Sequence, residues 1–298
     1  MNKALVICLI SGEYTLYDLS TSKTLLAKPR GVFRNNQTTV KVGDIVYYED
    51  GNPFATIVKV EPRKNDLVRP TIANIDQAIV VTSVKEPDLN LNLLDRFIAI
   101  LEYNDIVPIL VFNKIDLLDK DDNLDDTLDY YHKIGYQVFK TTTKEQHLIE
   151  KLKPLMANKI SVITGQSGVG KSSILNILDE KYMLATNNIS KALNRGKHTT
   201  RYTALLPFEN GWVADSPGFG IIDFSDMTEV DLSHSFIEFF NASNKCKFKG
   251  CLHLNEPSCE IKKLVEEKTI LTSRYENYVQ MINEIKIKIK RKWWYICK

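Results

Sequence analysis

Residues 165–173, GQSGVGKSS, have the composition and spacing of a phosphate-binding loop. The pattern G-x-x-x-x-G-K-S/T is met, with the apolar stretch ISVIT before the loop and SSILNIL after it. Glycines let the backbone curl so that several N–H groups face one phosphate, and the N-terminus of a following helix adds its dipole. A chance glycine turn is the alternative, and the strand and helix on either side disfavour it.

Each residue type in the loop has a chemical task. Lys171 would reach the β and γ oxygens of a nucleoside triphosphate, where it also serves catalysis, and Ser172 would ligate magnesium. We expect phosphate contacts from Gly165, Gln166, Ser167, Gly168, Val169, Gly170, Lys171, Ser172 and Ser173.

A second motif, N-K-x-D, predicts which base is bound. Asn113, Lys114 and Asp116 follow the apolar stretch VPILVF, and a loop at the carboxyl end of a parallel strand can reach a base. An aspartate there accepts hydrogen bonds from N1–H and the 2-amino group of guanine, whereas adenine offers no matching donors. Four residues alone match weakly and could be a solvated loop, but beside the phosphate loop they predict GTP or GDP as ligand. Thr142 and Thr143 end the next expected strand, so they either close over the base or form only a polar loop.

Two further segments are expected near the γ-phosphate. Asp215 in DSPGFG follows the apolar WVA, where it could hold magnesium through water, with the Gly218 N–H near the phosphate. The stretch RGKHTTRY contains Thr199 and Thr200, one of which would complete the magnesium shell. Phe219 follows Gly218 where a Ras-like enzyme has glutamine, and phenylalanine cannot orient water.

The base-reading motif precedes the phosphate loop, so the nucleotide-binding domain has a rotated order. Termini of compact domains often lie close together, so joining them and opening a new break costs little. The break falls just after the Asp-x-x-Gly segment, which therefore runs directly into the C-terminal part of the chain. Hydrolysis could then move that part.

Cysteine and histidine cluster near the C-terminus with the spacing of a metal site. The pattern Cys246-x4-Cys251-x-His253-x5-Cys259 supplies three thiolates and one imidazole, a full tetrahedral set with no open position. We predict one structural zinc ion per chain, and local unfolding of residues 246–260 without it. Incidental cysteines around a core histidine are the alternative, disfavoured because the chain has only five cysteines in 298 residues.

The elements that must position these groups fall into three segments. Residues 1–68 contain short alternating stretches typical of a small antiparallel barrel, namely LVICLI, YTLYDL, TTVKV, DIVYYE and ATIVKVEP. Residues 69–228 alternate buried strands with helices, in the order of an α/β domain with a parallel sheet. Residues 229–298 read as helical, with one amphipathic helix over 229–240, the Cys/His cluster and a long helical tail.

Composition excludes some classes of protein. With 44% hydrophobic and 26% charged residues the chain is an ordinary globular protein, and a net charge of +2 does not define a partner. The N-terminal apolar run is broken by Ser11, Gly12 and Glu13, and no run reaches membrane-spanning length, so we expect a cytoplasmic protein without a membrane partner. From Lys286 to Lys298 there are six basic residues and no acidic one, which form a basic tail.

These motifs together resemble the circularly permuted, small-ribosomal-subunit-dependent GTPases of the RsgA (YjeQ) family. The resemblance extends over essentially the whole chain, through NDLVRPTIANIDQ, LLDRFIAILE, VFNKIDLL, GQSGVGKSS, GKHTTR, DSPGFG and CLHLNEPSC in family order. It implies an N-terminal all-β OB barrel, a central α/β P-loop GTPase domain in permuted order and a C-terminal helical zinc-binding domain. It also implies late maturation of the small (30S) ribosomal subunit, with GTP hydrolysis stimulated by that subunit, and we expect a monomer.

The resemblance also implies a catalytic histidine, which carries over to His198. Its imidazole could position or polarise the attacking water once a partner orders the loop. A surface histidine that contacts RNA is the alternative. Arg195, Lys197 and Arg201 could supply charge to the transition state or bind phosphate backbone.

Contact with ribosomal RNA is expected from both ends of the chain. Arg30, Phe33 and Arg34 lie among the barrel strands, although the barrel lacks an obvious aromatic stacking row and could instead dock a protein. In the tail, KIKIKRKWWYICK could bind RNA backbone and stack its aromatics, lie on a membrane surface, or pack on the zinc domain. Two other classes remain open: a GTPase switch for a protein or membrane target, and a zinc-bearing RNA-binding module with a vestigial nucleotide site.

Overall fold

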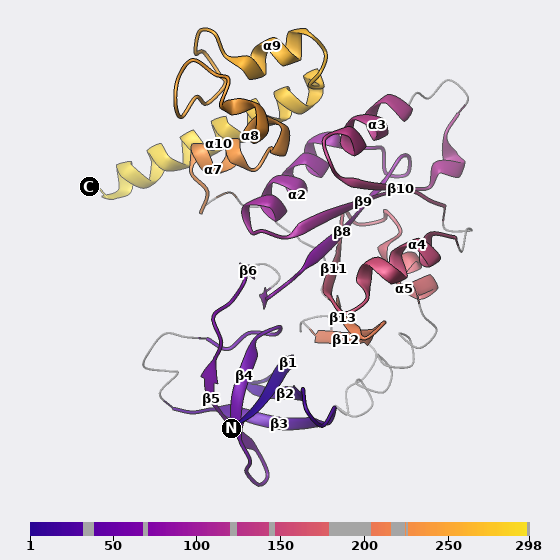
Figure 1. The fold of residues 1–298 in the computed structure, drawn as a ribbon, viewed down its shortest axis with the longest axis vertical. Helices are drawn as coiled ribbons and strands as arrows, with labels where there is room; N and C mark the ends of the chain where they lie inside the picture. Colours follow the sequence, from indigo (N-terminus) through magenta and orange to yellow (C-terminus); the bar gives the residue numbers. More distant parts are fainter. Residues whose placement is uncertain are drawn as a thin grey trace. The chain divides into compact units, whose positions relative to one another are not determined.

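A computed structural model describes residues 1–31, 39–67, 71–119, 124–142, 147–178, 204–215, 224 and 226–296. The chain divides into two compact units, and Figure 1 labels their helices and strands. Unit 1 comprises Met1–Ile79 and Thr143–Gly220, and unit 2 comprises Val80–Thr142 and Ile221–Lys298. The α/β segment therefore contributes to both units.

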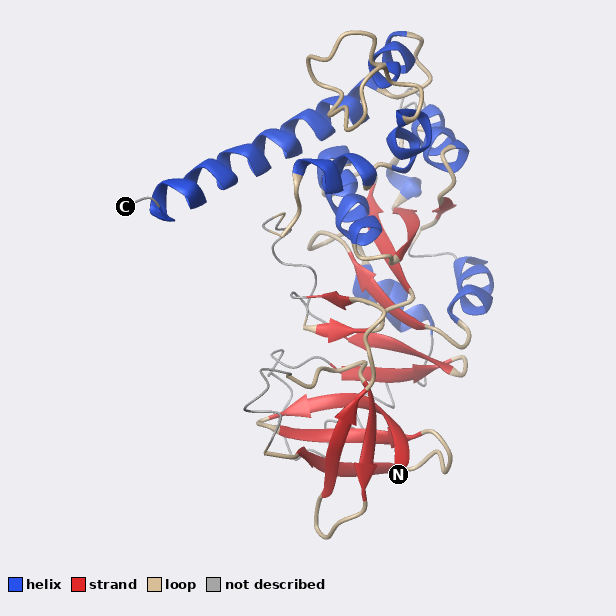
Figure 2. Ribbon diagram, turned by 60° about the vertical axis from the view of Figure 1, so that its left-hand side comes forward, coloured by secondary structure: helices blue, strands red, loops and turns tan. Residues whose placement is uncertain are grey.

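A five-stranded barrel begins unit 1. Its strands are β1 (Asn2–Ile10), β2 (Glu13–Asp18), β3 (Thr24–Pro29), β4 (Ile45–Glu49) and β5 (Ala55–Val60). The order β1-β2-β3-β5-β4 closes through pairing of β4 with β1, and β3 and β5 run parallel. Figure 2 shows the closed group of strands around the N-terminus. Alternating side chains such as Val6, Leu16, Val46 and Ile57 fill the interior. The expected OB barrel is confirmed.

Two details of the barrel differ from the sequence-based expectation. Strand β3 was not predicted, because only Ala27 of its side chains is buried and no alternation marks it. The stretch predicted as a strand around Val40 and Val42 forms, within residues 39–42, only an isolated bridge at Val42. Both valines are buried, but the N–H of Lys41 donates to the Asp44 carboxylate, at 2.7 Å, and not to a strand.

The phosphate-loop strand is joined to the barrel within unit 1. Strands β11 (Ile160–Thr164) and β13 (Gly211–Asp215) are parallel, β12 (Ala204–Phe208) is antiparallel to β13, and β12 pairs with β1. The rings of Tyr17 and Trp212 meet edge to face with centroids 4.9 Å apart. Helices α4 (His147–Met156) and α5 (Lys171–Leu178) complete this part.

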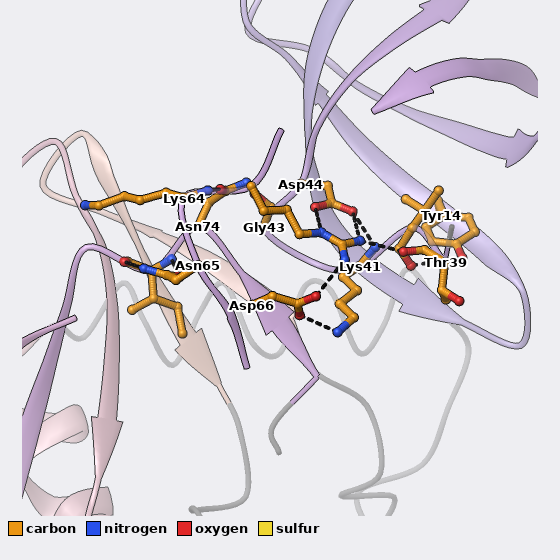
Figure 3. A network of polar contacts seen from close by, with 12 residues as sticks. Tyr14, Thr39, Lys41, Gly43, Asp44, Lys64, Asn65, Asp66 and Asn74 are labelled. Atoms are coloured by element: carbon orange, nitrogen blue, oxygen red, sulfur yellow. Dashed lines mark hydrogen bonds and ion pairs between the residues drawn. The ribbon is translucent and has the colours of Figure 1, made fainter. Parts of the chain in front are cut away.

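A polar network holds the segment that leaves the barrel, which contains β6 (Asp66–Leu67) and β7 (Ile72–Ala73) (Figure 3). The guanidinium of Arg63 donates to both carboxylate oxygens of Asp44, at 2.7 and 2.9 Å, and to Asp66 at 2.8 Å. The Asn74 side chain donates to the carbonyl of Gly43 at 2.9 Å. Gly43 has φ +89°, and an added Cβ would lie 2.0 Å from a backbone oxygen of β7. The exit from the barrel is therefore tightly fixed.

Three strands of the main sheet lie wholly or partly in unit 2. Strand β8 (Gln77–Ser83) begins in unit 1 and continues into unit 2, where β9 (Val107–Asn113) is its neighbour and β10 (Gln137–Lys140) runs parallel to β9. Helix α2 (Leu91–Tyr103) buries Leu94, Phe97, Ile98 and Leu101, the spacing of one helix face. The short 3-10 helix η1 (Ile115–Leu117) and helix α3 (Asp125–Lys133) lie between β9 and β10 in the sequence.

The C-terminal part of unit 2 is helical, as expected, but its helices are shorter. The predicted helix over 229–240 is two helices, α7 (Glu229–His234) and α8 (Ile237–Ser243), because Phe236 adopts an extended backbone and is fully buried. The predicted tail is α9 (Glu260–Glu266) and α10 (Thr272–Ile296). Among the described residues, no helix combines the length and apolar character needed to cross a membrane.

Candidate nucleotide and metal sites

The phosphate loop joins β11 to α5 and needs its glycines. Gly165, Gly168 and Gly170 have φ of +141°, +82° and +99°, a backbone region that disfavours other residues. Val169 is buried and anchors the loop, whereas residues 166–168 are exposed. The backbone thus forms a glycine-dependent, exposed turn at the start of a helix, which is suited to an anion.

Lys171 turns back into this loop. Its Nζ donates to the carbonyls of Gly165, at 2.9 Å, and Gln166, at 2.6 Å. Burial lowers the pKa of the ammonium group. An anion in the loop would offer the ammonium a charged acceptor in place of these neutral ones.

The predicted base-reading motif lies where β9 ends. Asn113 is fully buried as the last residue of the strand, and its carbonyl accepts from the N–H of Val84 at 3.0 Å. Lys114 adopts a left-handed conformation, φ +64°, which turns the chain into η1. Asp116 lies in that turn with an exposed side chain. The turn therefore places an exposed acidic residue directly after a buried strand.

A second loop begins at Thr141, after β10, and its first residues lie beside the turn that contains Lys114 and Asp116. The N–H of Thr141 donates to the carbonyl of Phe112 at 2.9 Å, and its carbonyl accepts from the N–H of Ile115 at 3.2 Å. The predicted Thr142 follows with a buried side chain. The structure thus brings Asn113, Lys114, Asp116 and Thr142 together in unit 2.

The predicted switch residues are mostly outside the described part of the chain. Asp215 is the last residue of β13, next in the sheet to the phosphate-loop strand β11. Outside the described residues lie Phe33, Arg34, Thr143, Arg195, Lys197, His198, Thr199, Thr200, Arg201, Gly218 and Phe219, together with the side chains of Asp215 and of residues 289–298.

The predicted metal ligands converge. Cys246, Cys251, His253 and Cys259 present ligand atoms that all lie within 4.8 Å of one another. The His253 Nδ1 is 3.7 Å from the Cys246 sulfur and 3.4 Å from that of Cys259. A tetrahedral zinc ion with the usual bond lengths places its ligand atoms about 3.5 to 3.8 Å apart. The cluster therefore fits such an ion through Nδ1.

Three side chains that the sequence did not indicate shape the segment 246–259 that carries the ligands, here called the metal loop. The Glu256 carboxylate accepts from the N–H groups of Leu252 and Leu254, both at 2.8 Å. The hydroxyls of Tyr275 and Tyr278 donate to the carbonyls of His253 and Leu252, both at 2.7 Å. The only sequence signal was the position of Glu256 among the ligands and the i, i+3 spacing of the tyrosines on α10.

Burial affects how the metal ligands are charged. It raises the pKa of the Cys251 thiol to about 12 and lowers the pKa of His253 to about 4. Without a cation the thiol keeps its proton at neutral pH and the imidazole is neutral. Metal binding would therefore displace thiol protons.

Comparison with known proteins agrees with this geometry. The sequence profile described as RsgA GTPase matches residues 60–225. The chain is 45% identical over 294 residues to the small ribosomal subunit biogenesis GTPase RsgA of Shouchella clausii, covering 98% of this chain and 100% of that protein. It is 41% identical over 292 residues to the protein of the same name from Bacillus subtilis, covering 96% and 98%.

Solved structures show the same fold. The structure of YloQ, described as a circularly permuted GTPase, matches with a TM-score of 0.82 at 37% identity, over 96% of this chain and 95% of that one. YjeQ from Thermotoga maritima matches with a TM-score of 0.83 at 36% identity, over 95% and 98%. The expected fold class, permuted order and resemblance are confirmed. The chain belongs to the RsgA GTPase family and is a GTP hydrolase.

Proposed function

We propose that this GTPase acts in late maturation of the small (30S) ribosomal subunit and that the subunit stimulates its GTP hydrolysis. The names of relatives that are 41% and 45% identical over nearly the whole chain support this assignment. The observation that carries it is the combination, in one chain, of an open phosphate loop, a base-reading turn, an N-terminal barrel and a Cys/His cluster. We further propose that the protein works as a monomer in the cytoplasm.

The guanine base is assigned to the paired loops of unit 2. Asp116 would accept from N1–H and the 2-amino group, and Asn113 and Lys114 would order the turn around the base. Thr142 and Thr143 would close over it. The exposed carboxylate of Asp116 and the hydrogen bonds that place the two loops side by side support this assignment.

The phosphates are assigned to the N–H groups of residues 165–173 and to Gly218, with Lys171 on the β and γ oxygens. Magnesium, when bound, neutralises charge that develops on the phosphates. Its proposed holders are Ser172, Asp215 and either Thr199 or Thr200. His198 is proposed to orient the attacking water, since Phe219 cannot.

Zinc is proposed as a structural ion, one per chain, held by Cys246, Cys251, His253 and Cys259. The closed donor set and the spacing of the ligand atoms support zinc in this role. We propose domain bounds of 1–68 for the OB barrel, 69–228 for the GTPase domain and 229–298 for the zinc domain.

An RNA-binding role is proposed for both outer domains. Lys245, directly before the metal loop, and Lys247, Phe248 and Lys249 within it are all exposed, and the Lys247 ammonium lies 5.5 Å from the ring centroid of Phe248. Exposed cations beside an exposed aromatic ring match phosphate backbone and an unstacked base. In the barrel, the Lys28 ammonium lies 3.8 Å from the ring centroid of Phe54.

The test is co-sedimentation with purified small and large subunits over a range of salt concentrations. Lys247→Ala/Lys249→Ala should weaken small-subunit binding and reduce the slope of log affinity against log salt by about one for each lysine. The matched control is Lys262→Ala/Lys263→Ala on α9, where carboxylates already lie 3.8 Å from the Lys263 ammonium. Equal binding to both subunits, or equal effects of both double variants, would contradict the proposal.

A further inference from the structure

Helix α10 makes polar contacts with two different parts of unit 2. Tyr275 and Tyr278 hold the backbone of the metal loop, as described above. Arg274 and Asn277, each one residue earlier, turn instead toward Asp95 on α2, with contacts of 2.5 and 2.6 Å. Two pairs at i, i+3 spacing thus fix one turn of α10 against the metal loop and against the base-reading half of the GTPase domain.

The contact at Asp95 is buried and charged. Asp95 is 0% and Arg274 1% exposed, and Arg274 also donates to Glu238 on α8 at 2.8 Å. Burial opposes the charge on Arg274, but the carboxylates of Asp95 and Glu238 hold its pKa well above the usual value. A buried, forked ion pair tolerates little displacement, because each charge loses its compensation when the geometry changes.

Asp95 continues the path toward the base-reading loops. Its carboxylate accepts from the hydroxyl of Tyr131 on α3 at 2.6 Å. The Tyr131 ring packs on Phe112, with centroids 6.4 Å apart. Phe112 directly precedes Asn113, and its carbonyl holds Thr141 of the second loop. From Arg274 and Asn277 to Phe112 the path therefore consists of buried side chains within one unit, and the backbone of α10 joins it to Tyr275 and Tyr278.

We propose that Asp95, Arg274 and Asn277 are positioning residues through which the metal loop controls guanine binding. An intact metal loop holds α10, α10 holds α2 and α3 through this cluster, and these helices hold Phe112 and the two loops. Loss of the metal would loosen Tyr275 and Tyr278 first, and the base-reading loops with them. This inference rests on the guanine and zinc sites of the proposed function.

The test measures binding of GDP and of inosine diphosphate to the full chain, with zinc bound and after removal by a chelator selective for zinc over magnesium. Inosine lacks the 2-amino group, so the GDP to inosine diphosphate affinity ratio reports placement of the Asp116 carboxylate. We expect zinc removal to weaken GDP at least about fivefold, the lower range of coupling between sites, and to reduce this ratio. By linkage, saturating GDP must raise zinc affinity by the same factor.

Variants separate this path from general damage to the fold. Asp95→Asn/Arg274→Met removes both charges of the Asp95–Arg274 pair and leaves Glu238 without its arginine partner. Tyr131→Phe removes only the hydroxyl that binds Asp95. Both should reduce the effect of zinc on GDP affinity to less than about twofold. The matched control is Glu284→Gln, which breaks another ion pair between α10 and α2, where Arg96 donates to Glu284 at 2.9 Å. That variant should keep the full effect.

Each outcome decides a separate point. GDP affinity that is unchanged by zinc removal, or a full zinc effect in the double variant, would overturn the inference. A zinc-loaded wild-type protein without preference for GDP over inosine diphosphate would instead overturn the guanine assignment, and failure to bind zinc would overturn the metal assignment. Stimulation by small subunits is measured separately and does not enter this test.

Discussion

Arg274→Met should destabilise unit 2 strongly. The side chain is 1% exposed and its partner Asp95 0%, so solvent does not screen the pair. Removing one partner of a buried pair leaves an uncompensated charge, which costs about 3–5 kcal/mol. Asp95→Asn/Arg274→Met should cost about 0.5–3 kcal/mol less than the sum of the two single variants, the usual interaction energy for residues in contact. Glu284→Gln, in the partly exposed pair with Arg96, should cost no more than about 1 kcal/mol.

The loss in Arg274→Met should grow with pH. Burial already raises the pKa of Asp95, and Arg274 is the largest influence that opposes this rise. Without the arginine the folded pKa rises further above the unfolded value of about 3.9, so the neutral acid is tolerated at low pH and stability is lost as pH increases.

Hydrogen exchange of α2 and α10 between pH 5 and 8, corrected for the intrinsic exchange rate, measures the opening free energy locally. Protection equal to wild type, or a loss that shrinks as pH rises, would refute this account of the buried pair.

Three further predictions concern unit 1. Gly43→Ala should lower the free energy of unfolding of the barrel by about 1–3 kcal/mol, because the added Cβ would meet a backbone oxygen of β7. Gly12→Ala, at φ +83° but facing open space, should lower it by only about 1 kcal/mol. Thermal denaturation compares the two variants, and equal losses would contradict this reasoning. Hydrogen bonds from hydroxyl groups, that of Ser20 first, lower the pKa of Asp18 in the folded protein. The Asp18 carboxylate therefore stabilises the fold fully above about pH 4, the pKa of aspartate in the unfolded chain, and this contribution is lost as the pH falls below it. Denaturant titrations of Asp18→Asn and wild type should therefore differ at pH 7 and converge toward pH 2, and a constant difference would argue against this. Lys171→Ala should weaken GTP binding at least about tenfold by calorimetry, since a charge-assisted phosphate contact is lost, while unchanged affinity would remove Lys171 from the phosphate site.

The sequence predicted the parts whose signals are local. The glycines of residues 165–170 mark a loop that few other residues could form, and the spacing of Cys246, Cys251, His253 and Cys259 marks a ligand set. Alternating apolar residues indicated the barrel. All of these depend on neighbours within a few residues in the chain.

The parts that the sequence did not predict depend on distant partners. Asp95 and Arg274 are 179 residues apart, and nothing near either residue shows that they form a pair. The break between α7 and α8 follows from burial of Phe236 in a core that other helices complete. The Lys41 segment appeared as a strand because its valines alternate, although its backbone bonds to Asp44.

The measurement that tests the central claim most directly is GTP turnover by the purified protein, alone, with small ribosomal subunits and with large subunits. We predict strong stimulation by small subunits only, which His198→Ala should abolish without loss of GTP affinity. Turnover that is unchanged by small subunits, in a protein that binds GTP normally, would contradict the proposed role in small-subunit maturation.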